Sequence, residues 1–421
     1  MAKTGVGAGL ELAVVGAGSR GFNYARIAVD DFGAGITAVV EPDLARRALF
    51  GETFGVPPER RFAAWGEMLA GERAAHAVVI ATPDRMHEEP AVLFADAGYD
   101  ILIEKPLAPE PESAQRIVEA VERNGVLMTV CHVMRYSSYS RGLKAILDGG
   151  RIGQILSIEH LEPIGWWHFA HSYVRGNWAV EADSSSMLMA KSSHDVDWLM
   201  HLMGRPVRKV SSFGSLSHFR PENRPAGAAE RCTDCPLVES CAYSAPKIYQ
   251  RFLGDPVGER WPLSVLSPDV SAAGVRAALE SGIYGQCVFK GENDVVDHQI
   301  VGLEFDNGAT ASLTVSAFTP PDFRKTRIMG TEGMITGDGK SLVIDDFLTA
   351  SQEHVDLSGP GSASAADGHG GADTELVGSF LAAVRQQDRG LVQSSAQASF
   401  ASHQVVWAAE CARKEARVVS V

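Results

Sequence analysis

The chain has 421 residues, of which 45% are hydrophobic and 21% charged, and its formal net charge is −14. A chain of this length is expected to form two domains, each with its own core. The acidic balance excludes a nucleic-acid partner, because a phosphate backbone requires a basic protein face. No apolar run is long enough to cross a bilayer, and the first residues lack the features of a signal peptide in their order. We therefore expect a cytoplasmic protein with no membrane partner.

The first third of the chain alternates between apolar strands and helical stretches. Continuous apolar strands between helices are typical of a parallel sheet that is covered on both faces. This pattern predicts an α/β domain over residues 1–132. The expected strands cover residues 12–15, 36–40, 77–81, 101–103 and 126–131, and the clearest helices begin at residue 21 and span 42–54.

The pattern changes after residue 132. Asp306-Asn307-Gly308 stands between two apolar runs, which is a hairpin signal, and strands joined by hairpins indicate an antiparallel sheet. We predict a second α/β domain over residues 133–421 with a large, mainly antiparallel open sheet, and an open face suggests a dimer or tetramer. The expected strands are 155–161, 207–217, 296–305, 310–318 and 326–329, and the expected helices are 138–147, 184–203, 374–387 and 396–414. We also expect an insertion at about residues 218–290 and a mobile loop, rich in Gly, Ala and Ser, at residues 358–373.

A glycine-rich turn follows the first strand and opens the first helix. Its sequence Gly16-Ala17-Gly18-Ser19-Arg20-Gly21 fits G-x-G-x-x-G in the required context. Gly16 permits the tight turn, Gly18 lets the backbone approach a pyrophosphate, and Gly21 lets the helix pack on the strand. The helix N-terminus directs free N–H groups at the phosphates. The turn predicts a dinucleotide site that includes Ser19 and Arg20.

Glu41 ends the second strand, twenty residues after Gly21. A carboxylate there accepts hydrogen bonds from the adenosine ribose and repels a 2′-phosphate, so NAD is favoured over NADP. Arg46 and Arg47 lie nearby and soften this preference. The alternative is an incidental glycine turn in an unrelated α/β protein.

Two further strand ends carry candidate cofactor residues. Thr82 and Pro83 end the third strand, where open α/β sheets bind ligands, and His87 follows them. We expect these residues to line the ribose and nicotinamide, although His87 also fits a surface helix. Glu104-Lys105-Pro106 follows the fourth strand, and the proline turns the chain sharply. Lys105 is then placed to donate to a substrate oxygen, unless it is a surface lysine paired with Glu104.

The stretches GAGSRG, ATPDRMH and EKPLA together resemble the glucose-fructose oxidoreductase/inositol dehydrogenase family, also called Gfo/Idh/MocA. The resemblance implies a Rossmann domain followed by an α/β domain with an open, mainly antiparallel sheet. It also implies hydride transfer between NAD(P) and a hydroxyl or carbonyl carbon of a sugar, polyol or related compound. By the match to Glu-Lys-Pro, it implies that Lys105 contacts both cofactor and substrate.

Many members of that family carry an aspartate and a histidine four residues apart on a helix of the second domain. His194 matches the histidine, but Ala190 stands where the aspartate is expected, and Lys191 is the obvious substitute. Lys191 and His194 are three residues apart, which predicts a shared helix face. A neutral His194 would accept the alcohol proton, while Lys191 would lower its pKa and stabilise an alkoxide. Alternatively, Lys191 pairs with Asp195, and His194 is a satisfied core residue.

Residues 165–178 hold three of the seven tryptophans, two histidines and an arginine in what reads as an irregular stretch. Aromatic faces suit the C–H faces of sugar rings, and polar side chains there bond hydroxyl groups. We expect His168, Arg175 and Trp178 to line the substrate pocket, with Tyr136 reaching the same cleft. The alternative is a core segment, because tryptophans are commonly buried.

Three cysteines form a C-x2-C-x5-C cluster within the insertion, at Cys232, Cys235 and Cys241. In a reducing compartment such cysteines are thiols or metal ligands, and this spacing suits zinc. Cys287 is the best candidate for a fourth ligand, and His218 is second. Four thiolates leave no open position, so the zinc would be structural. An iron–sulfur cluster is less expected, and reduced cysteines without metal are the alternative.

These features favour an NAD-dependent dehydrogenase of a sugar, an inositol-like polyol or a glycoside, with Lys105, Lys191 and His194 at the nicotinamide. A second hypothesis keeps NAD tightly bound and uses transient oxidation for epimerisation or glycosidic elimination. A third is a non-catalytic NAD-binding sensor or regulator, which the loss of the expected aspartate at Ala190 keeps open.

Overall fold

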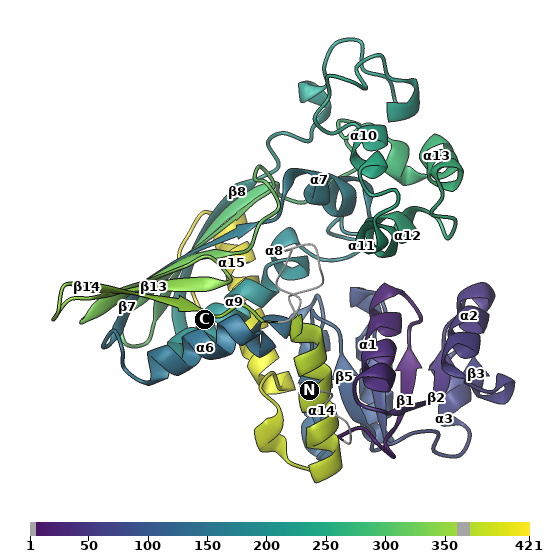
Figure 1. Cartoon of the computed structure of the whole chain (residues 1–421), viewed down its shortest axis with the longest axis horizontal. Helices are drawn as coiled ribbons and strands as arrows, with labels where there is room; N and C mark the ends of the chain where they lie inside the picture. Colours follow the sequence, from purple (N-terminus) through teal and green to yellow (C-terminus); the bar gives the residue numbers. More distant parts are fainter. Residues whose placement is uncertain (1–5, 360–370) are drawn as a thin grey trace.

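The computed structural model describes residues 6–359 and 371–421 (Figure 1). Two β-sheets organise the chain, and an irregular helical insertion stands beyond one end of the second sheet. Most of the loop predicted at residues 358–373 lies outside the described residues. Among the described residues, no helix has both the length and the apolar character needed to cross a membrane.

The first sheet has six parallel strands in the order β3-β2-β1-β4-β5-β6. Its central strands are almost entirely buried, as expected for apolar runs covered on both faces. The predicted parallel α/β domain is therefore confirmed. The strands are β1 Glu11–Val15, β2 Gly35–Val40, β3 Arg61–Phe62, β4 Ala77–Ile80, β5 Asp100–Ile103 and β6 Met128–Val130.

Helices cover both faces of this sheet and form two separate cores. On the amphipathic α5, Ala114, Ile117, Val118 and Val121 are buried at helical spacing, and the helix ends at Gly125 in a left-handed conformation. The helices of this part are α1 Ser19–Asp30, α2 Leu44–Phe54, α3 Trp65–Leu69, α4 Glu88–Asp96 and α5 Pro111–Asn124.

The second sheet has nine strands in the order β14-β13-β12-β11-β7-β10-β9-β8-β15. Only β7 and β10 pair in parallel, so the mainly antiparallel sheet is confirmed. The strands are β7 Ile155–Pro163, β8 Val207–Ser215, β9 His298–Phe305, β10 Thr310–Ser316, β11 Lys325–Gly330, β12 Gly333–Gly337, β13 Ser341–Asp346, β14 Ser351–Asp356 and β15 Val419–Ser420.

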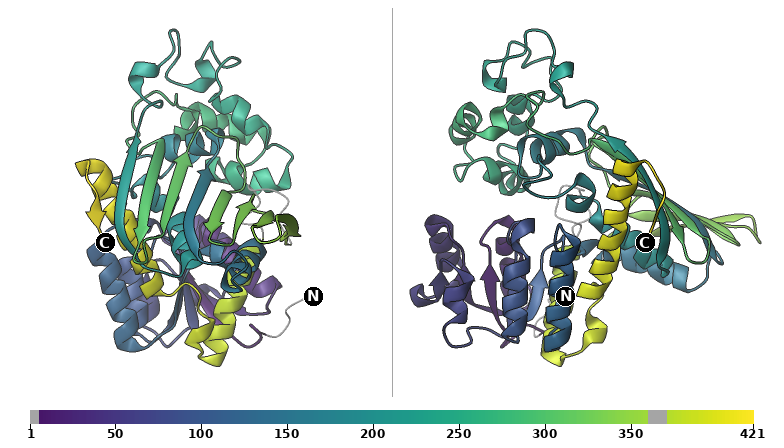
Figure 2. Two further views of the ribbon diagram at one scale, coloured as in Figure 1. Left: turned by 90° about the vertical axis from the view of Figure 1, so that its left-hand side faces the viewer. Right: turned by 180° about the vertical axis from the view of Figure 1, so that it is seen from behind.

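One face of the second sheet is packed and the other is open, as the face-on view in Figure 2 shows. Buried and more exposed residues alternate along β9, which is the pattern of a sheet with one covered face. On the open face, Phe213 and Ile300 lie in register on β8 and β9. The helices of this part are α6 Ser138–Asp148, α7 Trp166–Phe169, α8 Met187–Ala190 and α9 Ser193–Met203.

The two C-terminal helices return to the first sheet. In α14 (Ala372–Gln386), Leu376 and Phe380 belong to one core of the first sheet. The longer α15 (Ala396–Glu415) contacts α5, α9 and β8, so it joins both sheets. The division at residue 132 therefore stays a prediction, because chain order and spatial packing differ at the C-terminus.

Two predicted elements are wrong in detail. The single helix expected over residues 184–203 is divided into α8 and α9, with Lys191 and Ser192 between them. The stretch read as irregular is instead helical, with α7 followed by the π-helix η4 (Ala170–Arg175).

The insertion joins β8 to β9 (Figure 1), and it forms a small core that also includes Trp167 of α7. Its helices are short, and long loops connect them. They are α10 Ala245–Gln250, α11 Pro256–Gly258, α12 Ser264–Leu266 and α13 Ala272–Ser281.

Candidate active site

The glycine-rich turn has the geometry that a dinucleotide requires. Gly16 adopts a φ of +95°, and a Cβ there would lie 2.6 Å from the carbonyl oxygen of Ala81. A Cβ on Gly21 would lie 2.0 Å from the carbonyl oxygen of Gly16, so helix and turn pack too closely for a side chain. A Cβ on Gly18 would meet no atom within 4 Å. The space above Gly18 is therefore open for a pyrophosphate, next to the N-terminus of α1.

Glu41 lies beside this turn and is buried. Its carboxylate accepts hydrogen bonds from the backbone N–H groups of Ala17 (2.9 Å) and Asp43 (3.0 Å). Arg47 donates to the backbone carbonyls of Glu41 and Pro42. Of the two arginines expected to weaken the preference for NAD, Arg47 is thus engaged by the main chain, whereas Arg46 is exposed.

Arg20 connects the glycine-rich turn to the Glu-Lys-Pro turn. Its guanidinium lies 2.5 Å from the Glu104 carboxylate and 2.8 Å from Asp373 on α14. Tyr24 donates to the same Glu104 oxygen at 2.7 Å. Burial raises the pKa of Glu104, but Arg20 and Tyr24 outweigh it, so this pKa is lowered. The side chain of Arg20 therefore holds the two loops together, and a role of Arg20 toward the cofactor stays a prediction.

His87 braces the loops that follow β4 and β5. The ring is fully buried, and its two nitrogens lie 2.7 Å from the Pro106 carbonyl oxygen and 3.0 Å from the Thr82 carbonyl oxygen. The alternative that His87 is a surface residue is wrong. Contacts of Thr82, Pro83 and His87 with a cofactor remain predictions.

Lys105 reaches from the first domain to the second. Its Nζ donates to the backbone carbonyl of Ala190, at the end of α8. Burial lowers the pKa of Lys105, the charges of Asp84 and Glu104 oppose this, and Lys191 lowers it further. The Glu-Lys-Pro turn therefore meets the α8–α9 break, and Lys105 shares its surroundings with Lys191.

A carboxylate that the sequence analysis missed holds Lys191. The Nζ of Lys191 lies 3.1 Å from Oε1 of Glu162, whose other oxygen lies 2.9 Å from Arg324. Arg324 also lies 2.6 Å from Asp195. Lys191 therefore pairs with Glu162 on β7, and the expectation that it pairs with Asp195 is wrong.

His194 lies in the first turn of α9 and is buried. Because α8 ends at Ala190, Lys191 and His194 do not share the face of one helix, and that prediction is wrong. The ring of His194 lies 5.7 Å from that of His132, and burial lowers the pKa of His132 to about 4.

His168 lies close enough to Lys191 and Lys105 to be affected by their charges. Burial lowers the pKa of His168, and the charges of Lys191 and Lys105 lower it further. The two lysines are therefore the charged neighbours of His168. Its role in lining the substrate pocket stays a prediction.

Of the three other expected lining residues, Arg175 and Tyr136 bond to other parts of the chain. Arg175 is buried and donates to the backbone carbonyls of Gln286 and Tyr243 in the insertion, both at 2.8 Å. The Tyr136 hydroxyl lies 3.0 Å from the Ser394 hydroxyl and is buried, so the prediction that it reaches the cleft is wrong. Trp178 packs against the second domain's core.

A sequence signal for Glu162 exists in β7. Ile158, His160 and Glu162 alternate along the strand and are all buried on the same side of the sheet. Burying the polar side chains of His160 and Glu162 costs free energy unless both are hydrogen-bonded or ion-paired. Their positions in the alternating pattern therefore indicate a candidate functional site.

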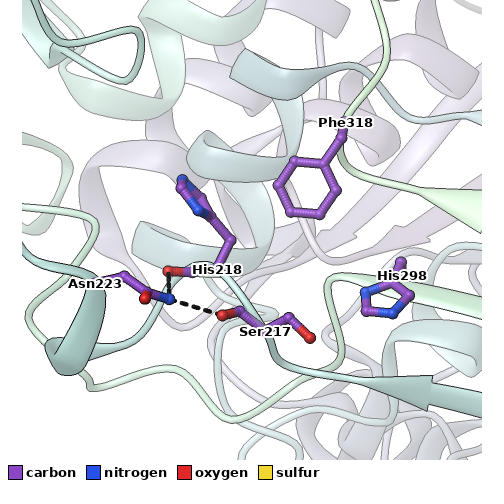
Figure 3. A pocket seen from close by; sticks show the side chains of 5 residues that line it. All are labelled: Ser217, His218, Asn223, His298 and Phe318. Carbon is purple, nitrogen blue, oxygen red and sulfur yellow. Dashed lines mark hydrogen bonds between the residues drawn. The ribbon is translucent and has the colours of Figure 1, made fainter.

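Cavities lie at the base of the insertion. One of 720 Å³ is lined by Ser217, His218, Asn223, His298 and Phe318, and Asn223 donates to the carbonyls of Ser217 and His218 (Figure 3). None of the predicted catalytic or cofactor residues lines it. Within residues 6–359 and 371–421, no three His, Cys, Asp or Glu side chains are arranged to hold a metal ion. Zinc therefore stays a prediction.

The fold and the glycine-rich turn define the class of protein. A six-stranded parallel sheet with the order 3-2-1-4-5-6 and an acidic end to β2 is a dinucleotide-binding domain. Residues 10–132 match the family model described as an oxidoreductase family with an NAD-binding Rossmann fold, and residues 144–421 match its C-terminal alpha/beta domain. The chain therefore belongs to the Gfo/Idh/MocA oxidoreductase family, which confirms the resemblance.

The relatives in sequence include dehydrogenases and hydratases. YteT of Bacillus subtilis, named an oxidoreductase, is 24% identical over 71% of this chain and 69% of its own length. Inositol 2-dehydrogenase of Corynebacterium glutamicum (strain ATCC 13032) is 32% identical over 50% of this chain and 60% of its own length. The 2,7-anhydro-N-acetylneuraminate hydratase of Mediterraneibacter gnavus is 27% identical over 49% of this chain and 53% of its own. The matches to the last two thus span just over half of those proteins.

Solved structures share the whole fold. An oxidoreductase from Agrobacterium radiobacter, in complex with NAD+, L-tartaric acid and magnesium, superposes with a TM-score of 0.70 at 18% identity, covering 98% of both chains. Levoglucosan dehydrogenase in complex with NADH and levoglucosan gives 0.67 at 18% identity, covering 98% of this chain and 99% of that one. At these identities the likeness shows the fold alone.

Proposed function

We propose that the chain is an NAD-dependent dehydrogenase acting on a CH–OH group of a sugar, polyol or glycoside. The observation that carries the proposal is the meeting of Lys105 and Lys191, one from each domain, where the turn after β5 touches the end of α8. His168 lies within reach of the charges of both lysines. NAD bound at the glycine-rich turn supplies the hydride acceptor.

Different side chains carry out the proton transfer and the stabilisation of charge. His194, in its neutral form, takes the hydroxyl proton while hydride leaves the same carbon, and it returns the proton in the reverse reaction. The ammonium groups of Lys105 and Lys191 stabilise the developing alkoxide. Glu162 fixes Lys191 in place through their 3.1 Å ion pair. This carboxylate on β7 compensates for the aspartate that Ala190 replaces.

The cofactor preference rests on Glu41. Its buried carboxylate lies at the end of β2, where the adenosine ribose of a bound dinucleotide is expected, and it would repel a 2′-phosphate. Since Arg47 is engaged by main-chain carbonyls, we infer that NAD is preferred over NADP.

A substrate screen tests the proposal. Inositols, sugars, glycosides and anhydrosugars are offered with NAD or NADP, and the absorbance of reduced cofactor is followed. Lys105→Ala is expected to lower kcat by about 10²-fold or more, because it removes a positioned cation from the reacting oxygen. Lys325→Ala is the matched control, since Lys325 is exposed and pairs with Asp322. Equal loss in both variants would contradict the assigned role.

In a second candidate function, NAD takes a hydride from the substrate and returns it within the same turnover. Tightly held NAD then drives epimerisation or glycosidic elimination. The relatives that are named hydratases are the reason to retain this candidate function. Product that forms without accumulation of free NADH would support this candidate over the dehydrogenase. A non-catalytic sensor would keep partner binding after Lys105→Ala, whereas an enzyme would lose turnover.

We also propose that the chain forms a homo-oligomer through the open face of the second sheet. Phe213 is 73% exposed and Ile300 is 51% exposed, and they lie opposite each other on neighbouring strands. The two strands lie second and third from the β15 edge of the sheet, and exposed apolar side chains that lie together favour a protein interface.

A further inference from the structure

Four cysteines surround one cavity in the insertion. Cys232, Cys235, Cys241 and Cys287 all line a cavity of 430 Å³, and none of them forms a disulfide. Cys287 is far from the others in sequence, but the backbone brings it to them. Arg231 pairs with Gln286 in an antiparallel bridge, and the N–H of Cys287 donates to the Glu230 carbonyl at 2.9 Å. The fold thus selects Cys287 as the neighbour of the C-x2-C-x5-C segment.

A buried arginine stands next to these sulfurs without a carboxylate. Arg175 is 5% exposed, and its guanidinium donates to two backbone carbonyls and lies 3.5 Å from the sulfur of Cys232. Among the described residues its Nη1 has no hydrogen-bond partner, and the partners of its other two nitrogens are backbone carbonyls and the Cys232 sulfur, none of them a carboxylate. A buried cation requires a nearby negative charge, and neutral thiols do not provide one.

From these contacts we propose that Cys232, Cys235, Cys241 and Cys287 bind one structural Zn²⁺ ion, with Arg175 as its buried counter-charge. Zinc with four thiolates carries a net charge of about −2, which supplies the negative charge that Arg175 lacks. The sulfurs surround the cavity and do not yet converge, so binding requires rotation of the cysteine side chains and closure of the loops. With four protein ligands, the ion has no open position for catalysis.

This site would connect the insertion to the candidate active site. Arg175 ends η4, which continues directly from α7, and α7 carries His168 beside the two lysines. Closing the cysteines on zinc therefore fixes the segment that presents His168.

Metal analysis of the full chain, purified without chelators, tests the proposal. We expect about one zinc per chain in the wild type and in Cys411→Ser and His218→Ala, and a loss of most zinc in Cys232→Ser and Cys287→Ser. If the cysteine variants fail to fold, cobalt added to metal-depleted wild type is expected to give the intense bands of a tetrahedral thiolate site. Wild type with neither zinc nor cobalt bands, or with iron and sulfide in place of zinc, would overturn the proposal.

The role of Arg175 has its own test. Arg175→Met is expected to bind zinc about 10-fold to 100-fold more weakly in competition with a chelator, because a bonded partner of the ligands is lost. Arg276→Met is the control, since Arg276 lies in the same insertion on α13, is exposed and pairs with Glu280 at 2.9 Å. Unchanged zinc affinity in Arg175→Met would contradict its role as counter-charge.

Discussion

At the scale of single residues, the three glycines of the turn are needed for different physical reasons. Gly21 and Gly16 are required by contacts within the protein, since a Cβ on either would clash with a backbone oxygen. Gly18 has no such contact, so the protein itself leaves room for a side chain there, and the predicted pyrophosphate is what a Cβ would meet. This difference separates folding from cofactor binding.

Gly18→Ala is expected to leave the free energy of unfolding almost unchanged and to weaken NAD binding about tenfold or more. Gly21→Ala is expected to destabilise the fold by about 1–3 kcal/mol, because its Cβ would lie 2.0 Å from the Gly16 carbonyl oxygen. Urea unfolding and NAD titration of both variants measure the two effects. Equal NAD affinity in Gly18→Ala and wild type would contradict the placement of the pyrophosphate.

The residue roles that the sequence predicted are those set by local chain geometry. Gly16, Glu41 and Lys105 end or follow strands of one parallel sheet, so their common edge was foreseeable. Arg175 was not, because its partners Tyr243 and Gln286 lie 68 and 111 residues away along the chain. The alternation along β7 marks Glu162 as a buried polar residue, but its role did not follow from that pattern, because Arg324 comes from just before β11, far along the chain.

At the scale of elements, α15 supports the Glu-Lys-Pro turn from behind. Trp407 donates to the Pro109 carbonyl at 2.7 Å, and His403 accepts from the Leu107 N–H at 2.9 Å. A C-terminal helix thus holds the loop that carries Lys105.

Trp407→Phe removes the hydrogen bond to Pro109 and keeps most of the packing. We expect a loss of about 1 kcal/mol in the free energy of unfolding. If the turn shifts, kcat falls by about tenfold, equivalent to 1.4 kcal/mol, while NAD affinity holds. Gln397→Ala on the same helix is the control, because Gln397 is exposed and bonds Glu122 away from the turn, and steady-state kinetics measure kcat in both variants. An unchanged kcat would show that α15 does not position the turn.

Elements with a clear hydrophobic period were predicted well, and those without one were not. The apolar run of β1 and the amphipathic α5 follow from their sequences alone. The break between α8 and α9 carries no glycine or proline, so the sequence gives no local stop signal at Lys191. The break arises where Lys191 turns to Glu162 and Lys105 bonds the end of α8.

At the scale of the whole molecule, the open sheet face is the expected interface between copies. Phe213→Asp places a charge on this face, and we expect the dimer or tetramer to dissociate at least about 100-fold more readily. Phe347→Asp is the control, because Phe347 is 59% exposed in the turn after β13. Light scattering after size exclusion measures the mass, and a wild type that is monomeric would contradict the interface.

Buried histidines make the fold sensitive to acid. Burial lowers the pKa of His132 and His201 to about 4, and that of His171 and His403 to about 3. Between pH 7 and 5 the unfolded chain takes up protons at these positions and the folded chain does not, so stability falls as pH falls. The carboxylates with lowered pKa remain ionised in both states over this range.

For a histidine like His132, the loss between pH 7 and 5 is about 2 kcal/mol. Urea midpoints at the two pH values measure it, and His132→Phe is expected to show a smaller dependence than wild type. A midpoint that does not change with pH would mean that these histidines have ordinary pKa values in the fold.

The proposed function depends most on a dinucleotide that lies against Gly18 and is bound by Glu41. The purified full chain is first treated with acid, and any nucleotide that it releases is measured. The chain is then titrated with NAD and with NADP by calorimetry. We expect either saturable NAD binding, at least about tenfold tighter than NADP binding, or NAD already carried by the protein. If neither nucleotide binds at millimolar concentration and none is released, the proposed dinucleotide site is wrong.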